Sequence, residues 1–241
     1  MTKKKIIREM RGVKWNDPRC LHSSEELINL IEEVGFLPLF RNEIEGFSVE
    51  EYTMVNNWWT KDEKKDPWLW RVDIARSGRV AYGKFFQKKA GFISKEWFPC
   101  FANFRRNGYD FDSLYEDGGA KQRCKKIMDL FENQKLISSI AMKKEAGFEK
   151  GGEKNFNGIL TELQMQMYLT IQDFNRKKNK RGEEYGMYVS YYDTPEQLWG
   201  YEYITSCYKE SPEISRQFVE QFMRKMYSKS SLMAINKNLC S

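Results

Sequence analysis

The sequence predicts a helix-rich α+β fold with a winged helix-turn-helix in its second half. Three observations predict it. Amphipathic runs with capping residues dominate the chain, strand-like segments are short and paired, and residues 121–192 follow one particular order. That order is helix, helix, helix, strand, basic loop, strand, which is typical of a winged helix-turn-helix domain. Because the first half allows a similar pattern, tandem winged-helix units are the alternative architecture.

The third run of this segment carries a helical apolar stripe. Phe156, Leu160, Leu163 and Met167 recur at spacings of four, three and four, which predicts a helix with one buried face. In helix-turn-helix domains the later helix enters the major groove of DNA, so its polar side is a candidate surface for bases. The candidate groove-facing residues are Asn155, Asn157 and Thr161.

Two strand-like runs, 168–174 and 185–192, flank a polar loop that ends at Gly182. The runs are rich in the aromatic and β-branched residues that strands prefer, whereas the loop is too polar to bury. We therefore expect a hairpin with a basic tip, in the position of a wing. Together with the turn before the third helix, it supplies the candidate phosphate contacts: Lys150, Lys154, Arg176, Lys177, Lys178, Lys180 and Arg181.

The positive charge of the chain is concentrated in this same segment. The whole chain has 40 basic and 34 acidic residues, and residues 121–182 contain 14 basic and 7 acidic ones. The remainder is close to neutral, so the excess lies where the pattern predicts double-stranded DNA as partner. The alternative is a solvated surface loop, because charge runs usually serve as one.

Length, cysteines and missing motifs bound the remaining possibilities. At 241 residues the chain can bury one substantial core or two small ones, and no apolar run approaches the ~20 residues of a membrane-spanning helix. Five scattered cysteines indicate reduced thiols and a cytoplasmic protein without a membrane partner. The single histidine, His22, and the lack of phosphate-loop glycines indicate neither a metal nor a cofactor.

Along the chain we expect a basic arm over 1–22, an aromatic-rich α+β domain over 23–112, the winged-helix domain over 113–193 and C-terminal helices over 194–241. Ser23 predicts a helix ended by Gly35, and Asp66 with Pro67 predicts a second one. Ser48 and Glu51 form the pattern of a capping box. A hairpin is expected across residues 87–89, and two helices over 195–208 and 212–227.

Twelve aromatic residues crowd into positions 58–104. Aromatic side chains bury large areas, so a core is the expected role for most of them. The alternative is a surface that stacks nucleobases, for which Trp59 and Trp70 are the candidates.

Four motifs carry a family resemblance that covers roughly residues 25–225. They are D-P-W-x-W-R at 66–71, Y-G-K-F-F at 82–86, A-G-F-I-S at 90–94 and L-T-E-L-Q-M-Q-M-Y-L at 160–169. With them the chain resembles the bacterial AlkZ-related proteins, distant relatives of the AlkZ/YcaQ winged-helix DNA glycosylases. The resemblance implies tandem winged-helix units around a DNA channel. In those glycosylases a Gln-x-Gln or Gln-x-Asp motif positions the water that hydrolyses the glycosidic bond of an alkylated or crosslinked nucleotide.

Gln164 and Gln166 match that motif in letters, and Glu162 lies one turn before Gln166 as a candidate base. The resemblance implies the two glutamines as catalytic candidates, and Glu162 is a third candidate if it faces a channel. If the helix continues through them, the two amides lie on opposite flanks of the apolar stripe, and they then serve as helix-surface or DNA-facing groups. Further acid or base candidates are Asp66, Asp73, Asp110, Asp112 and Asp173.

The sequence therefore predicts a DNA-binding winged-helix protein that resembles alkylation-repair glycosylases, with N-glycosidic bond hydrolysis as its candidate reaction. A transcriptional regulator or interaction module without chemistry is the alternative. The pattern leaves the oligomeric state open.

Overall fold

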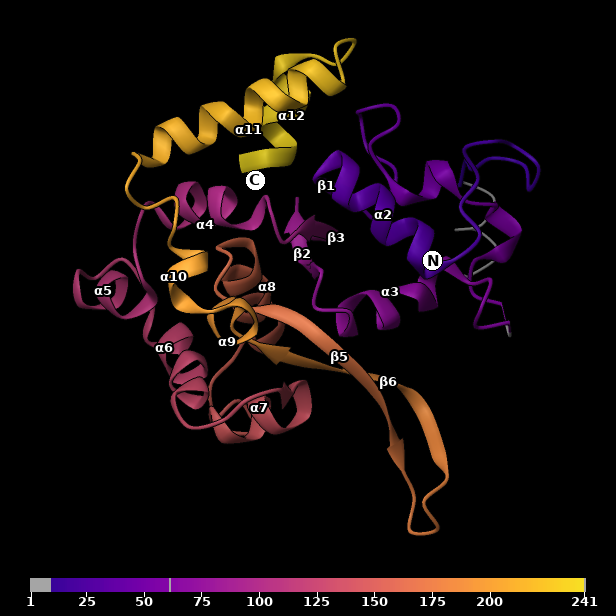
Figure 1. Cartoon of the computed structure of the whole chain (residues 1–241). Helices are drawn as coiled ribbons and strands as arrows, with labels where there is room; N and C mark the ends of the chain where they lie inside the picture. Colours follow the sequence, from indigo (N-terminus) through magenta and orange to yellow (C-terminus); the bar gives the residue numbers. More distant parts are fainter. Residues whose placement is uncertain (1–9, 61, 241) are drawn as a thin grey trace. The chain divides into compact units, whose positions relative to one another are not determined.

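The computed structural model describes residues 10–60 and 62–240, which form two compact units of mixed α and β structure (Figure 1). The first unit comprises the chain up to Phe98 and again from Arg216, and the second unit is Pro99–Ser215. The chain from Arg216 onward thus shares a unit with the N-terminal part, whereas the sequence indicated segments bounded near 112 and 193. Residues 1–9 of the expected basic arm lie outside the described residues.

In the first unit three antiparallel strands follow one another in the order β1-β3-β2. Its strands are β1 (Phe36–Pro38), β2 (Val80–Phe86) and β3 (Lys89–Ser94), and β3 pairs with both others through Phe92, opposite Leu37 and Tyr82. The predicted hairpin is therefore confirmed. The helices of this unit are α2 (Ser24–Val34), α3 (Pro67–Arg76), most of α11 (Pro212–Met226) and α12 (Leu232–Cys240).

Local capping explains where α2 and α3 begin. The Ser23 side chain accepts a hydrogen bond from the backbone N–H of Glu26, and the Asp66 side chain accepts one from Trp68, with Pro67 as the first helical residue. Each cap satisfies a backbone donor that has no partner within its helix. Both helix starts are placed as the sequence predicts.

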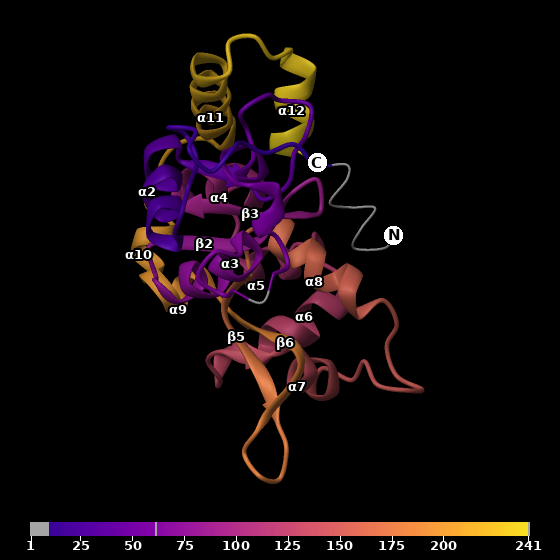
Figure 2. The same cartoon turned by 90° about the vertical axis from the view of Figure 1, so that its right-hand side faces the viewer.

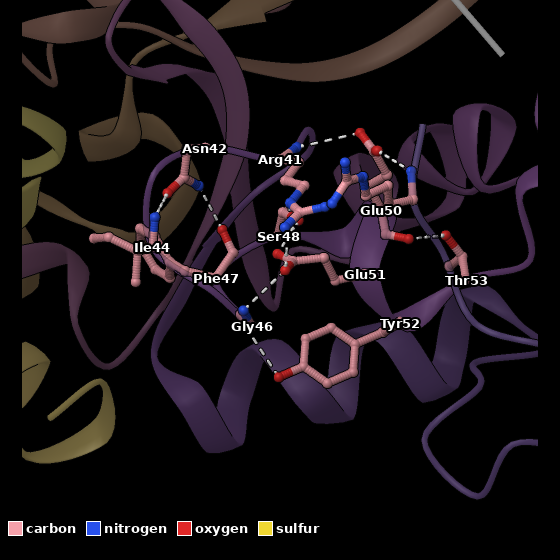
Figure 3. A network of polar contacts seen from close by, with 11 residues as sticks. Arg41, Asn42, Ile44, Gly46, Phe47, Ser48, Glu50, Glu51, Tyr52 and Thr53 are labelled. Atoms are coloured by element: carbon pink, nitrogen blue, oxygen red, sulfur yellow. Dashed lines mark hydrogen bonds and ion pairs between the residues drawn. The ribbon is translucent and has the colours of Figure 1, made fainter. Parts of the chain in front are cut away.

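The predicted capping box at Ser48 does not form. Ser48 Oγ instead donates to the Glu51 carboxylate over 2.6 Å, and the following residues make only a 3-10 turn, Val49–Tyr52 (Figure 3). Tyr52 donates its hydroxyl to the carbonyl of Gly46, and Asn42 bonds the backbone of both Ile44 and Phe47. The side chains of the loop thus satisfy its own backbone, and Glu51, which Ser48 contacts, accepts from the backbone N–H of Gly46 instead of completing a helix cap.

Aromatic residues fill the core of the first unit. Trp58, Trp70, Phe85 and Phe92 are at most 2% exposed, as the core interpretation predicts. Of the two candidates for base stacking, Trp70 is therefore enclosed. The other, Trp59, is half-buried with Trp68 beside Phe40. From the C-terminal part of the unit, Phe222 packs 4.3 Å from Trp97 between ring centroids.

In the second unit three antiparallel strands follow one another in the order β5-β6-β4. Its helices and strands follow in the order α5 (Phe111–Glu116), α6 (Gln122–Met128), β4 (Ile137–Ser138), α7 (Ser139–Glu145), α8 (Phe156–Met165), β5 (Thr170–Lys178), β6 (Glu184–Asp193), α9 (Pro195–Trp199) and α10 (Tyr201–Ile204). A 3-10 turn, Asp129–Glu132, follows α6, and α4 (Phe98–Arg106) precedes them all.

Two details of this unit differ from the sequence prediction. The two-residue strand β4, which pairs with β6, is too short to show a pattern in the sequence. The helix expected over 195–208 is interrupted at Gly200, whose φ of 90° lies outside the helical region and separates α9 from α10.

Candidate nucleic-acid interface

The turn between α7 and α8 is built by its glycines and by one aromatic pair. Gly147 and Gly151 adopt φ of 77° and 90°, which only glycine reaches without strain. Phe148, between the two turn glycines, packs on Phe156 at the start of α8, with ring centroids 5.3 Å apart. This packing fixes the direction in which α8 leaves the turn.

A groove of about 730 Å³ opens along this turn. Its walls come from α7, the turn, the first residues of α8 and one residue of β5: Ser139, Ile140, Lys143, Phe148, Glu149, Lys150, Glu153, Asn155, Phe156, Asn157 and Lys177. Four of the predicted DNA-binding residues, Lys150, Asn155, Asn157 and Lys177, therefore line one concave surface. Sequence spacing does not indicate that Lys177 reaches the start of α8, because only folding brings this part of β5 beside it.

The charge of the groove is positive once the neighbouring ion pairs are counted. Lys143, Lys150 and Lys177 line it together with Glu149 and Glu153. The Glu153 carboxylate accepts from Lys126 over 2.8 Å, and this bond lowers its pKa, so its charge is already balanced. Three lysines then stand against one glutamate within the groove.

The N-terminus of α8 opens into this groove without a side-chain cap. Asn155 is the residue before the helix, in the left-handed region with φ of 66°, and its side chain caps no backbone N–H of the first turn. Helix N-termini carry partial positive charge and N–H groups that point outward. A phosphate is a natural partner for such a helix end.

The β5–β6 hairpin extends beyond the helices of its unit (Figure 1, Figure 2). Asn179 shapes its tip, because its side-chain oxygen accepts from the N–H groups of Arg181 and Glu183. Arg176 is half-buried, with its guanidinium 4.8 Å from the centroid of the Tyr188 ring. Four predicted phosphate contacts on the hairpin are exposed: Lys177, Lys178, Lys180 and Arg181.

Two predicted residues lie apart from this surface. Lys154 is exposed, but it does not line the groove. Thr161 is only 8% exposed, and its hydroxyl donates to the carbonyl of Asn157 within α8 over 2.8 Å. The buried side of α8 is thus wider than the apolar stripe and includes Thr161. Thr161 therefore does not face the groove.

The three catalytic candidates also lie on α8 or at its end. Gln164 is 1% exposed, and its amide donates to the carbonyl of Leu160. Gln166 is the half-exposed residue that follows the last turn, and residues two apart on a helix project to nearly opposite sides. Glu162 forms an ion pair with Lys121 over 2.8 Å. The structure therefore does not bring the two amides to one side of α8.

A second concavity, of about 350 Å³, lies in the same unit between α5, α6, α9 and α10. Its polar lining is mainly acidic, with Asp110, Asp112, Asp129, Glu132 and Glu196, and Tyr168, Phe111 and Phe131 form aromatic walls. Tyr201 donates its hydroxyl to Asp110 over 2.7 Å, which raises the pKa of Tyr201 to about 12. Sequence patterns identified only Asp110 and Asp112 as candidates here. The other carboxylates lie on segments that only folding brings to this cavity.

Within residues 10–60 and 62–240, no group of three or more His, Cys, Asp or Glu side chains is arranged to hold a metal ion. Among the helices of the same residues, none combines the length and the apolar character needed to cross a membrane.

Comparison with known proteins gives one match. No curated protein and no solved structure is significantly similar to the chain. The model of the family described as AlkZ related matches residues 21–239, which is nearly the whole chain. On this match, the chain belongs to the AlkZ-related family.

Proposed function

We propose that the protein binds double-stranded DNA through a winged-helix unit formed by α6 to β6. The observation that carries the proposal is the groove at the start of α8, where Lys143, Lys150 and Lys177 meet Asn155 and Asn157. Lysines are suited to phosphates and asparagines to base edges, so the groove offers both kinds of contact that duplex recognition needs.

The order of the elements supports a winged helix. The chain runs α6, β4, α7, α8, β5, β6, and β6 pairs with β4 on one side and with β5, its partner in the long hairpin, on the other. In this arrangement α8 takes the place of the recognition helix and the hairpin that of the wing. Family membership and the resemblance to DNA glycosylases favour the same partner.

The distribution of exposed groups indicates how the duplex would lie. The first turn of α8 and the lysines of the groove would hold one stretch of backbone, and the tip of the hairpin would hold a second. Because six of the ten residues of α8 are buried, only its N-terminal turn is free to approach bases. We therefore expect binding dominated by phosphates, with a limited sequence preference.

The test is duplex binding by fluorescence anisotropy across a salt series. With about five phosphate contacts, affinity is expected to fall roughly 100- to 1000-fold between about 50 and 200 mM salt. A flat salt response, or no binding at the lowest salt, would remove the proposal.

Glycosidic bond hydrolysis is the second candidate function. The structure favours the acidic cavity over the glutamine pair as its site. The amides of Gln164 and Gln166 diverge, whereas the acidic cavity gathers Asp110, Glu196 and Tyr201 around an aromatic-walled space. Carboxylates stabilise the positive charge that develops on the sugar when a glycosidic bond breaks. We infer that any such chemistry uses Asp110 and not the glutamine pair.

Incubation with an alkylated duplex, followed by detection of abasic sites, separates the enzyme from a regulator or interaction module without chemistry. Activity that is lost in Asp110→Asn and kept in Gln166→Ala would support the cavity. Activity lost only in Gln166→Ala would return the reaction to the glutamines. No abasic sites with intact DNA binding would leave the protein as a binder.

A further inference from the structure

Two cysteines of the second unit lie close enough to react with each other. The sulfur atoms of Cys100, on α4, and Cys207, after α10, are 3.3 Å apart, although 107 positions separate them in the sequence. Both are free thiols and both are half-buried, so a small oxidant can reach them. No sequence pattern indicates the pair, because the two cysteines are distant in the chain and share no motif.

Neighbouring hydrogen bonds hold the two cysteines in place. Asn103, one turn after Cys100 on α4, donates its amide to the carbonyl of Cys207 over 2.7 Å and to that of Glu210 over 3.1 Å. The same amide contacts Ser215 Oγ at 2.9 Å. Since Asn103 is fully buried, the segment that carries Cys207 is fixed against α4 and the sulfur atoms cannot drift apart freely.

We propose that Cys100 and Cys207 form a reversible disulfide when the protein meets a peroxide. The thiolate of one cysteine attacks a peroxide oxygen, the O–O bond breaks, and a sulfenic acid and water result. The second cysteine then attacks the sulfenic sulfur, an S–S bond forms, and a second water leaves with the remaining thiol proton. The two thiols lose two electrons and the peroxide gains them.

Burial slows this reaction at neutral pH. Burial, followed by the hydrogen bond with the neighbouring thiol, raises the pKa of Cys100 to about 12. Its thiolate is therefore scarce at neutral pH, and the thiolate is the nucleophile in both steps. We accordingly expect the disulfide to form faster as the pH rises.

The disulfide would close nearly the whole second unit into one covalent loop. Cys100 is the second residue of that unit, and Cys207 lies close to its end. The loop would contain α5 to α10, and with them the groove and the hairpin. A crosslink across so long a loop restricts the unfolded chain strongly, so oxidation should stabilise this unit in particular.

The experiment treats the full chain with hydrogen peroxide and maps disulfides by mass spectrometry of unreduced peptides. We expect one crosslinked peptide pair containing Cys100 and Cys207, a mass loss of about 2 Da that dithiothreitol reverses, and a higher thermal unfolding midpoint. Cys100→Ser and Cys207→Ser should each lose the crosslink and the shift in midpoint. Cys124→Ser is the matched control, because Cys124 is buried in the same unit, and it should keep both.

Several results would overturn the proposal. They are a disulfide that joins Cys20, Cys124 or Cys240, a crosslink between two molecules, or oxidation of Cys100 or Cys207 to sulfinic acid without a crosslink. Because the mapping is done on the unchanged protein, a serine variant that fails to fold does not weaken the test.

Discussion

Arg106 and Met167 are joined by a buried hydrogen bond. The Nη2 atom of Arg106 donates to the carbonyl of Met167 over 2.6 Å, and none of the arginine side chain is exposed. Its Nη1 atom pairs with Glu196 and contacts the hydroxyl of Tyr208. One guanidinium on α4 thus ties the segment after α8 to the start of α9 and to the chain that follows α10.

Replacement of this arginine should therefore be severe. In Arg106→Met the carboxylate of Glu196 and the carbonyl of Met167 lose their buried partner, and the free energy of unfolding should fall by about 3–5 kcal/mol. Urea denaturation measures the loss. Arg105→Met is the matched control, since Arg105 is half-exposed and reaches the carbonyl of Met165 only at 3.3 Å. It should lose about 1 kcal/mol, and equal losses would contradict the assigned role of Arg106.

The hairpin tip should govern the salt dependence of DNA binding. Replacing Lys178, Lys180 and Arg181 by alanine removes three exposed charges from the proposed wing and should reduce the slope of log affinity against log salt by about 2 to 3. Anisotropy titrations with one duplex measure the slope.

A control with the same change in net charge replaces Lys209, Lys225 and Lys229, which are exposed outside the groove and hairpin. This variant should keep the slope of the unchanged protein. If both triple variants lose the same slope, the wing has no special part in binding.

Gly158 offers a change that separates DNA binding from stability. A Cβ atom at this position would lie 2.3 Å from Oδ1 of Asn155, so Gly158→Ala displaces the Asn155 side chain from its place in the groove. The end of a flexible side chain moves at little cost, and alanine favours the helix, so unfolding should change by less than about 1 kcal/mol.

DNA affinity should nevertheless fall in Gly158→Ala. Asn155→Ala, which removes the same amide without displacing anything, should fall by a similar factor. Unchanged affinity in both variants would take Asn155 out of the interface.

The acid stability of the first unit should depend on Glu43. The hydrogen bond from Lys237 on α12, followed by that from its own backbone, lowers the pKa of Glu43 from 4.5 to about 2. A pKa lowered by folding stabilises the protein fully above the unfolded value, and the contribution is lost as the pH falls from about 4.5 to 2.

Thermal unfolding midpoints measured across this pH range should fall less steeply for Glu43→Gln than for the unchanged protein. Glu45→Gln, an exposed neighbour, serves as control and should keep the steep fall. If Glu43→Gln follows the unchanged protein, the pair with Lys237 contributes nothing to acid stability.

Local chemistry explains which parts of this fold the sequence predicts correctly. Ser23 and Asp66 mark helix starts because a short polar side chain can cap the backbone that follows it immediately. The hairpin over 80–94 was equally clear, since its strands are adjacent in the chain. Ser48 shows the limit of such patterns: its partner is again Glu51, but the loop around Gly46 recruits both side chains.

The candidate site divides in the same way. The sequence by itself determined that a basic loop follows a short helix, and with the family motifs it identified the AlkZ-related family. Only the tertiary structure decided that Lys177 shares a groove with Asn155, that Gln164 and Thr161 are buried, and that Cys100 meets Cys207. The physical reason is distance along the chain. Capping, periodicity and turns act between near neighbours, whereas burial and a shared cavity depend on segments that only folding brings together.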